Sequence, residues 1–283
     1  MARLNQIHRK LDWHLRRNTN KLRQAVRAWF ASTIKRITDD LTRKYIKDRV
    51  SDLTDWAMIE EEGKSFLKPI VLDTFLAGKT AAYGVIGFHG AFDVLNVEAV
   101  KRAEAICAKL ITEVTNETKK AIRTRIAAGI KEGLSMGKIA RELRDVVGLT
   151  ERQASAVANF KSWLQTKYPD MSEIDAGRKI KIYSIDLHNY RTNTIARTET
   201  ARAQSMGYVD GLQDTGVKLV EFSPYPGCCE ACAAMDGETY KLEEAGQVIP
   251  VHPNCRCVLL PVVEEEALTS EAIKPSEELE CPD

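Results

Sequence analysis

Apolar residues in the first part of the chain recur every three or four positions. Between Leu4 and about Glu62 this spacing is regular, and basic side chains occupy the opposite side of the repeat. A spacing of three or four positions places the apolar residues on one face of an α-helix. We therefore predict long amphipathic helices here. The apolar positions are Leu4, Ile7, Leu11, Leu15, Leu22, Val26, Phe30, Ile34, Ile37, Leu41 and Tyr45.

The same spacing predicts further helices in the middle of the chain. One runs from Val100 to Ile130 and ends among glycines. A short amphipathic helix is then closed by Gly148, and Thr150 with Gln153 fits the capping box that opens the next helix. A last long helix is predicted for residues 189–212. Short helices joined by glycine are typical of plain packing, although they also occur in DNA-binding hairpins.

Two segments break the helical pattern. Phe66–Phe92 is apolar but contains four glycines, which weaken a helix and permit close approach of two backbones. It is predicted to be an interface or a loose helical pair. Lys167–Asp186 contains Pro169, Gly177 and many polar residues, and is predicted to be a loop or connector.

The pattern changes again after Val217, where short apolar runs, KLVEFS and CVLLPVV, are separated by Pro, Gly and Cys. Such runs predict a small strand-rich unit. The fold class is therefore mainly α, with long N-terminal helices and helical pairs followed by a small α+β C-terminal module. The predicted regions are 1–98, a basic helical part; 99–186, a helical domain with its connector; 187–263, the C-terminal module; and 264–283, an acidic flexible tail.

The net charge of +1 over 283 residues conceals a strong asymmetry. Residues 1–50 contain fourteen Lys or Arg against four acids, whereas from Leu219 onward there are fourteen acids against three basic residues. A basic end can bind nucleic acid or an acidic protein surface, or simply present solvated helix faces. No stretch is apolar enough to predict a membrane helix, and the N-terminus shows no secretory signal, so we expect synthesis in a reducing cytosol.

Cysteine usage points to a metal site. Five of the seven cysteines lie between Cys228 and Cys257, and in a reducing compartment such a cluster favours metal binding over disulfides. Cys229 and Cys232 form a C-x2-C pair, and His252 with Cys255 forms an H-x2-C pair. Four such ligands suit tetrahedral zinc. We predict Cys229, Cys232, His252 and Cys255 as ligands of a structural Zn²⁺ that stabilises the C-terminal module.

Alternatives to this ligand set remain open. Cys257 can take the place of Cys255, Cys228 can replace Cys229 so that the first pair becomes C-x3-C, and the thiols can also be free or joined in disulfides. Structural zinc contributes on the order of 10 kcal/mol to the folding of isolated small peptides, which a segment of this size needs. Glu230 and Asp236 lie nearby in sequence, but nothing marks either as the base of a catalytic zinc.

A second candidate for catalysis is the pair formed by Arg197 and Glu199. Glu199 can instead pair with Arg202 one helical turn away, which makes a structural ion pair the favoured interpretation. No set of nucleophile, base and orienting group is evident in the sequence. We therefore predict that the chain is not an enzyme, and keep a hydrolase or transferase as a rival hypothesis.

Four motifs in fixed order carry a family resemblance. The segment IARTETARAQSMGY is followed by the C-x2-C pair, by Asp236-Gly237 and by HPNCRC. This combination, within roughly Gly133–Val262, resembles the phage head morphogenesis family, the phage Mu F-like minor head proteins. The extra Cys228 departs from the family pattern and leaves the register of the first pair open.

The resemblance implies a minor capsid protein of a tailed bacteriophage, located in the virion at the portal vertex or in the head interior after assembly in the host cytoplasm. Expected partners are the portal protein and the major capsid protein, with packaged DNA as a further partner for the basic N-terminal helices. The expected role is support of head assembly and of DNA packaging or ejection. The alternative is a zinc-containing DNA-binding protein, which would bind duplex DNA tightly as an isolated chain.

Overall fold

The computed structural model describes residues 2–43, 55–87, 97–134 and 136–262. The predicted acidic tail, residues 264–283, and the end of the glycine-rich segment, residues 88–92, lie outside the described residues. The fold is mainly helical with a small sheet near the C-terminus, as the sequence pattern predicts. None of the described helices combines the length and the apolar character that crossing a membrane requires.

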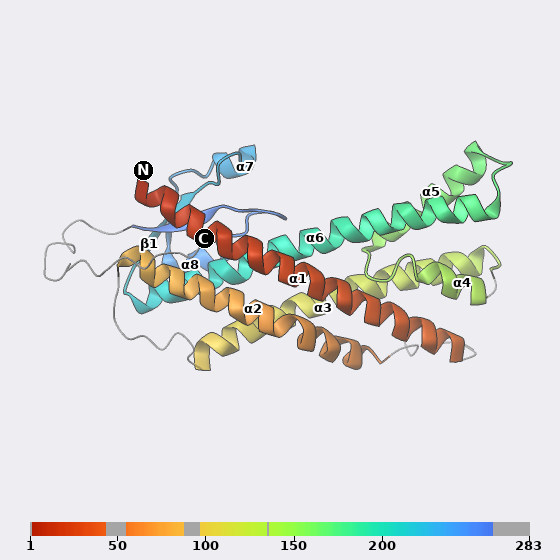
Figure 1. Cartoon of the computed structure of the whole chain (residues 1–283), viewed down its shortest axis with the longest axis horizontal. Helices are drawn as coiled ribbons and strands as arrows, with labels where there is room; N and C mark the ends of the chain where they lie inside the picture. The colour runs from red at the N-terminus through yellow and green to blue at the C-terminus, as the bar shows by residue number, and fades with distance from the viewer. Residues whose placement is uncertain (1, 44–54, 88–96, 135, 263–283) are drawn as a thin grey trace, which may run out of the picture.

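Long helices lie side by side to form the helical body, and a small sheet packs at one end of it (Figure 1). We call residues 217–262, which contain this sheet, the sheet module. The helices of the body are α1 (Ala2–Arg43), α2 (Trp56–Ile86), α3 (Val97–Lys131), α4 (Met136–Leu143), α5 (Glu151–Lys167) and α6 (Glu173–Asp214). The elements of the sheet module are β1 (Leu219–Ser223), α7 (Glu230–Ala233), β2 (Thr239–Lys241), α8 (Leu242–Val248) and β3 (Val258–Val262).

The predicted apolar face of α1 is confirmed between Leu22 and Ile37, whereas Leu4, Ile7, Leu11, Leu41 and Tyr45 lie outside the described side chains. Leu22, Val26 and Trp29 are almost fully buried, and they pack in one continuous core with residues of α2, α3, α4 and α6. The indole N–H of Trp29 donates to the carbonyl oxygen of Ile59 over 2.9 Å, so the buried ring leaves no unpaired donor. The predicted capping box is also present, because Thr150 and Gln153 exchange hydrogen bonds at the start of α5.

Helices α2 and α6 approach each other closely at glycines. A Cβ added to Gly78 would lie 2.0 Å from the carbonyl oxygen of Gln204, and one added to Gly207 would lie 1.9 Å from that of Phe75. The predicted close approach of backbones is thus confirmed. The predicted loose helical pair is wrong for residues 66–86, which form the second half of the continuous helix α2.

The predicted connector Lys167–Asp186 is wrong over most of its length. Helix α6 already begins at Glu173, because the side chain of Ser172 accepts a hydrogen bond from the backbone N–H of Asp175 and caps the first turn. Only residues 168–172 separate α5 from α6, and the predicted boundary at 186/187 falls inside α6. The two helices form a hairpin that extends away from the body (Figure 1).

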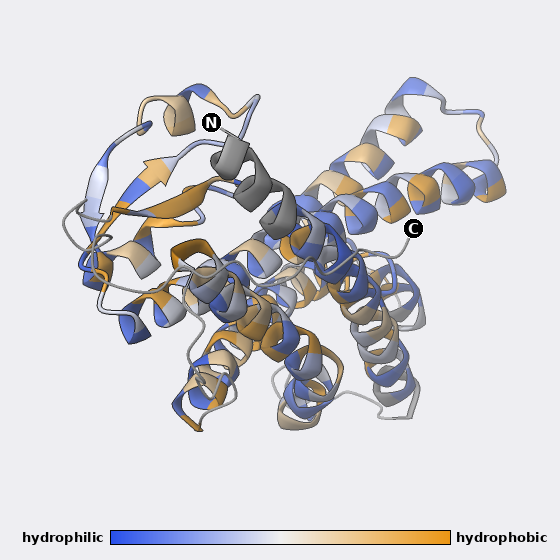
Figure 2. Cartoon of the chain, turned by 60° about the vertical axis from the view of Figure 1, so that its left-hand side comes forward, coloured by the Kyte–Doolittle hydropathy of each residue, from blue (hydrophilic) through white to orange (hydrophobic). Residues whose placement is uncertain are grey.

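The sheet module contains an antiparallel sheet with the strand order β2-β1-β3. Val220 and Phe222 on β1 are fully buried, and they alternate with more exposed residues as expected for a strand with one face on a core. Gly237, at φ +78°, turns the chain, and its N–H donates to the carbonyl oxygen of Phe222. Figure 2 shows apolar residues in β1 and β3, whereas β2 is hydrophilic and the α5–α6 hairpin alternates between hydrophilic and hydrophobic positions.

Candidate metal centre

The first pair of thiols is held by the short helix α7. Cys229 stands immediately before this helix, and its carbonyl oxygen accepts a hydrogen bond from the N–H of Ala233 over 2.9 Å. Cys232 follows three positions later, which places both side chains on the same side of the helical turn. Cys229 is exposed, whereas Cys232 is almost fully buried.

The second pair lies on a tight turn that is fastened to α6. The N–H of Cys255 donates to the carbonyl oxygen of His252 over 3.1 Å and closes the turn. Asn254 takes the left-handed conformation, with φ 66°, which Asn tolerates better than most residues. Its N–H donates to the hydroxyl oxygen of Thr198 on α6 over 3.0 Å, which links the turn to the RTE segment.

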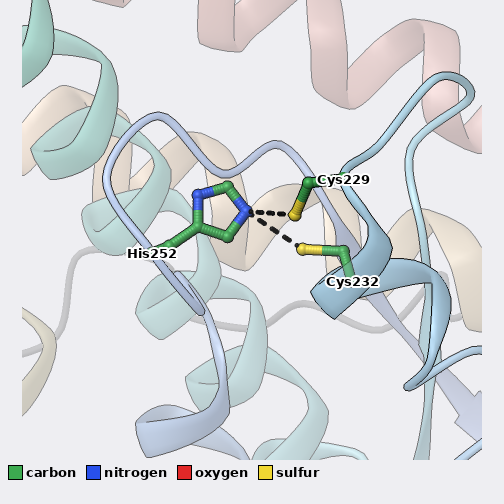
Figure 3. Close-up of side chains that lie close together, drawn as sticks. All are labelled: Cys229, Cys232 and His252. Atoms are coloured by element: carbon green, nitrogen blue, oxygen red, sulfur yellow. Dashed lines mark hydrogen bonds between the residues drawn. The ribbon is translucent and has the colours of Figure 1, made fainter.

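The imidazole of His252 points at the first pair of thiols (Figure 3). Its Nε2 lies 3.2 Å from the Sγ of Cys229 and 3.1 Å from the Sγ of Cys232. Its Nδ1 lies 2.8 Å from the carbonyl oxygen of Pro253, an acceptor only, so Nδ1 carries the proton. The lone pair of Nε2 is therefore directed at the sulfurs, which is the arrangement of a metal-binding histidine with a backbone partner.

Cys232 also belongs to a second, buried group of thiols. Its Sγ lies 3.9 Å from the Sγ of Cys255, and the sulfurs of Cys232, Cys255 and Cys257 all lie within 4.8 Å of one another. The same limit holds for the ligand atoms of Cys229, Cys232 and His252. The two groups thus share Cys232, while Cys228 belongs to neither.

These distances fit a tetrahedral zinc ion. With Zn–S bonds of about 2.3 Å and Zn–N bonds of about 2.05 Å, two sulfurs lie about 3.8 Å apart and a sulfur lies about 3.5 Å from the nitrogen. The S–S distance of 3.9 Å and the N–S distances of 3.1 and 3.2 Å are within about 0.4 Å of these values. The donor types therefore suit zinc, and the three distances that involve neighbouring donors are close to its spacing, although Cys255 falls in the second group and not in the group of Cys229 and His252.

The ionisation of the cluster favours a cation as well. Burial raises the pKa of Cys232 to about 12, whereas a hydrogen bond from Cys257 lowers the pKa of Cys255 to about 5. The hydrogen bond to Pro253 raises the pKa of His252. Neighbouring thiols thus oppose one another's ionisation. A divalent cation removes this conflict, because it stabilises several thiolates and the neutral imidazole at once.

The structure brings three of the four predicted ligands, Cys229, Cys232 and His252, into one group and places the fourth, Cys255, beside Cys232. Cys257, weighed only as a substitute for Cys255, lies equally within reach of Cys232. The choice between these two cysteines stays a prediction. The sequence did not predict the hydrogen bond from Asn254 to Thr198. The only indication of it was that the RTE and HPNC motifs occur in the same chain.

Glu199 pairs with Arg202 and not with Arg197. The carboxylate of Glu199 is buried and pairs with Arg202 over 3.0 Å, as the helical spacing suggests. Burial raises the pKa of Glu199. Arg197 is exposed on another side of α6, because two positions on a helix are separated by about 200°.

Fold and site together define a helical protein with a small sheet module whose cysteines and histidine converge as in structural zinc sites. No match to the chain was found among curated proteins or among solved structures. The family model for the phage Mu protein F like proteins matches residues 120–260, which include the end of α3, the α5–α6 hairpin and almost the whole sheet module. The chain belongs to this family of phage head morphogenesis proteins.

Proposed function

We propose that this protein is a structural component of the phage head in which one zinc ion, bound by Cys229, Cys232, His252 and Cys255, stabilises the sheet module. The observation that carries the proposal is that these donors lie in two groups that share Cys232, where the HPNC turn is tied to α6 through Thr198. Bound zinc would hold α7 against this turn. Its chemical contribution would be structural, since it supplies folding free energy.

The composition of the small core supports a structural metal. Cys232, Cys255 and Cys257 are all buried members of this core, beside Val220 and Phe222. A three-stranded sheet with two short helices buries little apolar area, so it gains little stability from packing alone. Zinc bound to the same cysteines would supply the missing part, as it does in other small modules.

Membership of the family supports a place in the virion, at the portal vertex or in the head interior. We propose the portal protein and the major capsid protein as partners, and support of head assembly and of DNA packaging or ejection as the role. The protein acts in this proposal through contacts and not through catalysis. The burial of Glu199 and its pairing with Arg202 support a structural role for this residue.

The alternative, a DNA-binding protein that reads sequence with its basic N-terminal helix, has less support. Helix α1 is packed into the helical body, and several of its basic residues already have partners there. Lys21 pairs with Asp73 of α2 over 3.5 Å, and Arg27 donates to Asn189 of α6 over 2.8 Å. A helix engaged in this way is not free to enter the major groove of DNA.

The test is complementation of a phage that lacks the gene, with the purified particles as the readout. We expect the wild type and Cys228→Ser to be incorporated into heads, because Cys228 belongs to neither group of ligand atoms. We expect Cys232→Ser to be missing from heads, because Cys232 belongs to both groups. Normal heads with Cys232→Ser in its usual amount would contradict a role for the metal in assembly. Normal heads without any copy of the chain would contradict a head protein altogether.

A further inference from the structure

An open groove of about 380 Å³ lies between the N-terminal part of α1, the middle of α6 and the loop that carries HPNCRC. It is separate from the metal centre, since no proposed ligand lines it. Figure 1 shows α1 passing over α6 beside the sheet module, where these segments meet. The lining residues are Leu15, Arg16, Thr19, Asn20, Arg197 and Arg256.

Three arginines from distant parts of the sequence line this groove, and no acidic residue does. Asp12, just beside it, orients two of them: it pairs with Arg16 over 2.7 Å and also with Arg256. The guanidinium of Arg256 lies 4.4 Å from the centre of the Tyr225 ring, which fixes it further. Two of the three groups are therefore held in position before any ligand arrives.

Arg197 is the third group, and its charge is not compensated. It is exposed, and it makes no ion pair with any residue in the part of the chain that the structure describes. With Asp12 counted against the three arginines, the site has a net charge of +2 by direct count. The hydroxyl of Thr19 and the amide of Asn20 add neutral hydrogen-bonding groups at the same place. The groove is thus prepared for an anion.

We propose that this groove binds a phosphate group. A carboxylate offers two oxygens in one plane, which a single guanidinium can saturate. Three guanidiniums that approach from three different segments match the tetrahedral oxygens of a phosphate better. The phosphate can belong to a nucleic-acid backbone or be free in solution, and contacts of this kind bind the backbone without reading its sequence.

The site extends the function proposed above and does not depend on it. The failure of either proposal is visible separately, because Arg197 is not a metal ligand. If an Arg197 variant loses phosphate binding but keeps its normal metal content, the result tests the groove and leaves the metal centre untouched. Loss of metal in a cysteine variant concerns the metal centre.

The experiment compares the full-length wild type with Arg197→Gln, Arg197→Lys and Arg178→Gln. Arg178 is the matched control, because it is an exposed arginine on the same helix, about 28 Å away at 1.5 Å per residue. Three probes are titrated: inorganic phosphate by calorimetry, and a labelled 20-base-pair duplex and poly-glutamate by fluorescence anisotropy over a salt series. Circular dichroism confirms that each variant is folded.

We expect Arg197→Gln to weaken the binding of phosphate groups at least tenfold, and Arg178→Gln to change it less than twofold. Arg197→Lys should be intermediate, because it keeps the charge but loses the two-pronged contact. An effect on duplex DNA, with the salt slope reduced by about 1, identifies the nucleic-acid backbone as the source. An effect on inorganic phosphate alone identifies free phosphate. Equal effects of both Gln variants, or poly-glutamate bound more tightly than either phosphate probe, would overturn the proposal.

Discussion

The helical body and the sheet module are stabilised in opposite ways. The core of the body is spread over apolar side chains from α1, α2, α3, α4 and α6, so no single residue dominates it. The core of the sheet module is small and shared with α2 and α6, and it contains the neighbouring thiols of Cys232, Cys255 and Cys257. The loss of one apolar side chain costs a distributed core part of its stability, whereas the loss of one ligand can release the metal altogether. One chain can therefore lose one part and keep the other.

The largest effect is expected from Cys232→Ser. Cys232 is shared by both groups of ligand atoms, so its loss should release the metal and unfold the sheet module while the helical body remains. Circular dichroism should retain most of the helical signal, and hydrogen exchange should lose protection in β1, β2 and β3. A strong chelator should reproduce the change in the wild type. Complete unfolding of the helices would contradict the division into two differently stabilised parts.

Two cysteines serve as matched controls for this substitution. Cys228→Ser should leave metal content and protection unchanged, because this thiol lies outside both groups. Cys107→Ser changes a buried thiol within the body, where burial raises its pKa to about 11. It should cost the body about 1–2 kcal/mol through the buried hydroxyl and leave the metal in place.

The next largest effect is expected from Lys79→Met, at the junction of the two regions. The ammonium group of Lys79 is 1% exposed and lies 2.7 Å from Asp210 and 2.8 Å from Asp214. Removal of the buried cation leaves carboxylates without their main partner, so the free energy of unfolding should fall by about 3–4 kcal/mol. Urea unfolding measures this change. Lys101→Met, which breaks the exposed pair with Glu98, should cost less than about 1 kcal/mol, and equal losses would contradict the expected role of burial.

A smaller but clear effect is expected from Gly207→Ala, which tests the packing inside the body. The new methyl group would lie 1.9 Å from the carbonyl oxygen of Phe75, so α2 and α6 must move apart. We expect a loss of about 2–3 kcal/mol in thermal or urea unfolding. Gly84→Ala on α2 is the control, because its methyl group meets no atom within 4 Å. That variant should be more stable than the wild type by about 0.5–1 kcal/mol.

The smallest effect is expected from Thr150→Ala at the start of α5. It removes the hydroxyl that accepts from the N–H of Gln153 over 3.2 Å, and a lost cap of this kind costs about 1 kcal/mol. Urea unfolding of the body should register this loss, with no change in metal content. A change in bound metal would show that the hairpin and the sheet module are coupled more tightly than their separate cores suggest.

Local patterns predicted most of the helices and two of the three strands, because helical spacing, caps and alternation depend on neighbours in sequence. The start of α6 was missed, since Pro169 and Gly177 weighed more than the cap formed by Ser172. Strand β2 was missed because it contains only three residues. The spacing of the ligands predicts the two pairs of the metal centre. The choice between Cys255 and Cys257 depends on tertiary geometry.

Other features depend on contacts that no local pattern contains. The groove joins Arg16, Arg197 and Arg256, which are separated by up to 240 positions, and only the packing of α1 on α6 brings them together. The hydrogen bond from Asn254 to Thr198 likewise spans two distant motifs. In both cases the sequence shows which residue types are present but not that they lie close together in the fold.

The most direct test of the account is the metal content of the full-length protein purified without added metal, combined with X-ray absorption at the zinc edge. We expect about one zinc per chain, surrounded by three sulfur atoms and one nitrogen atom, with bond lengths near 2.3 and 2.05 Å. A chain that is free of metal, whose sheet module is nevertheless fully protected from hydrogen exchange and whose thiols all react freely, would contradict it.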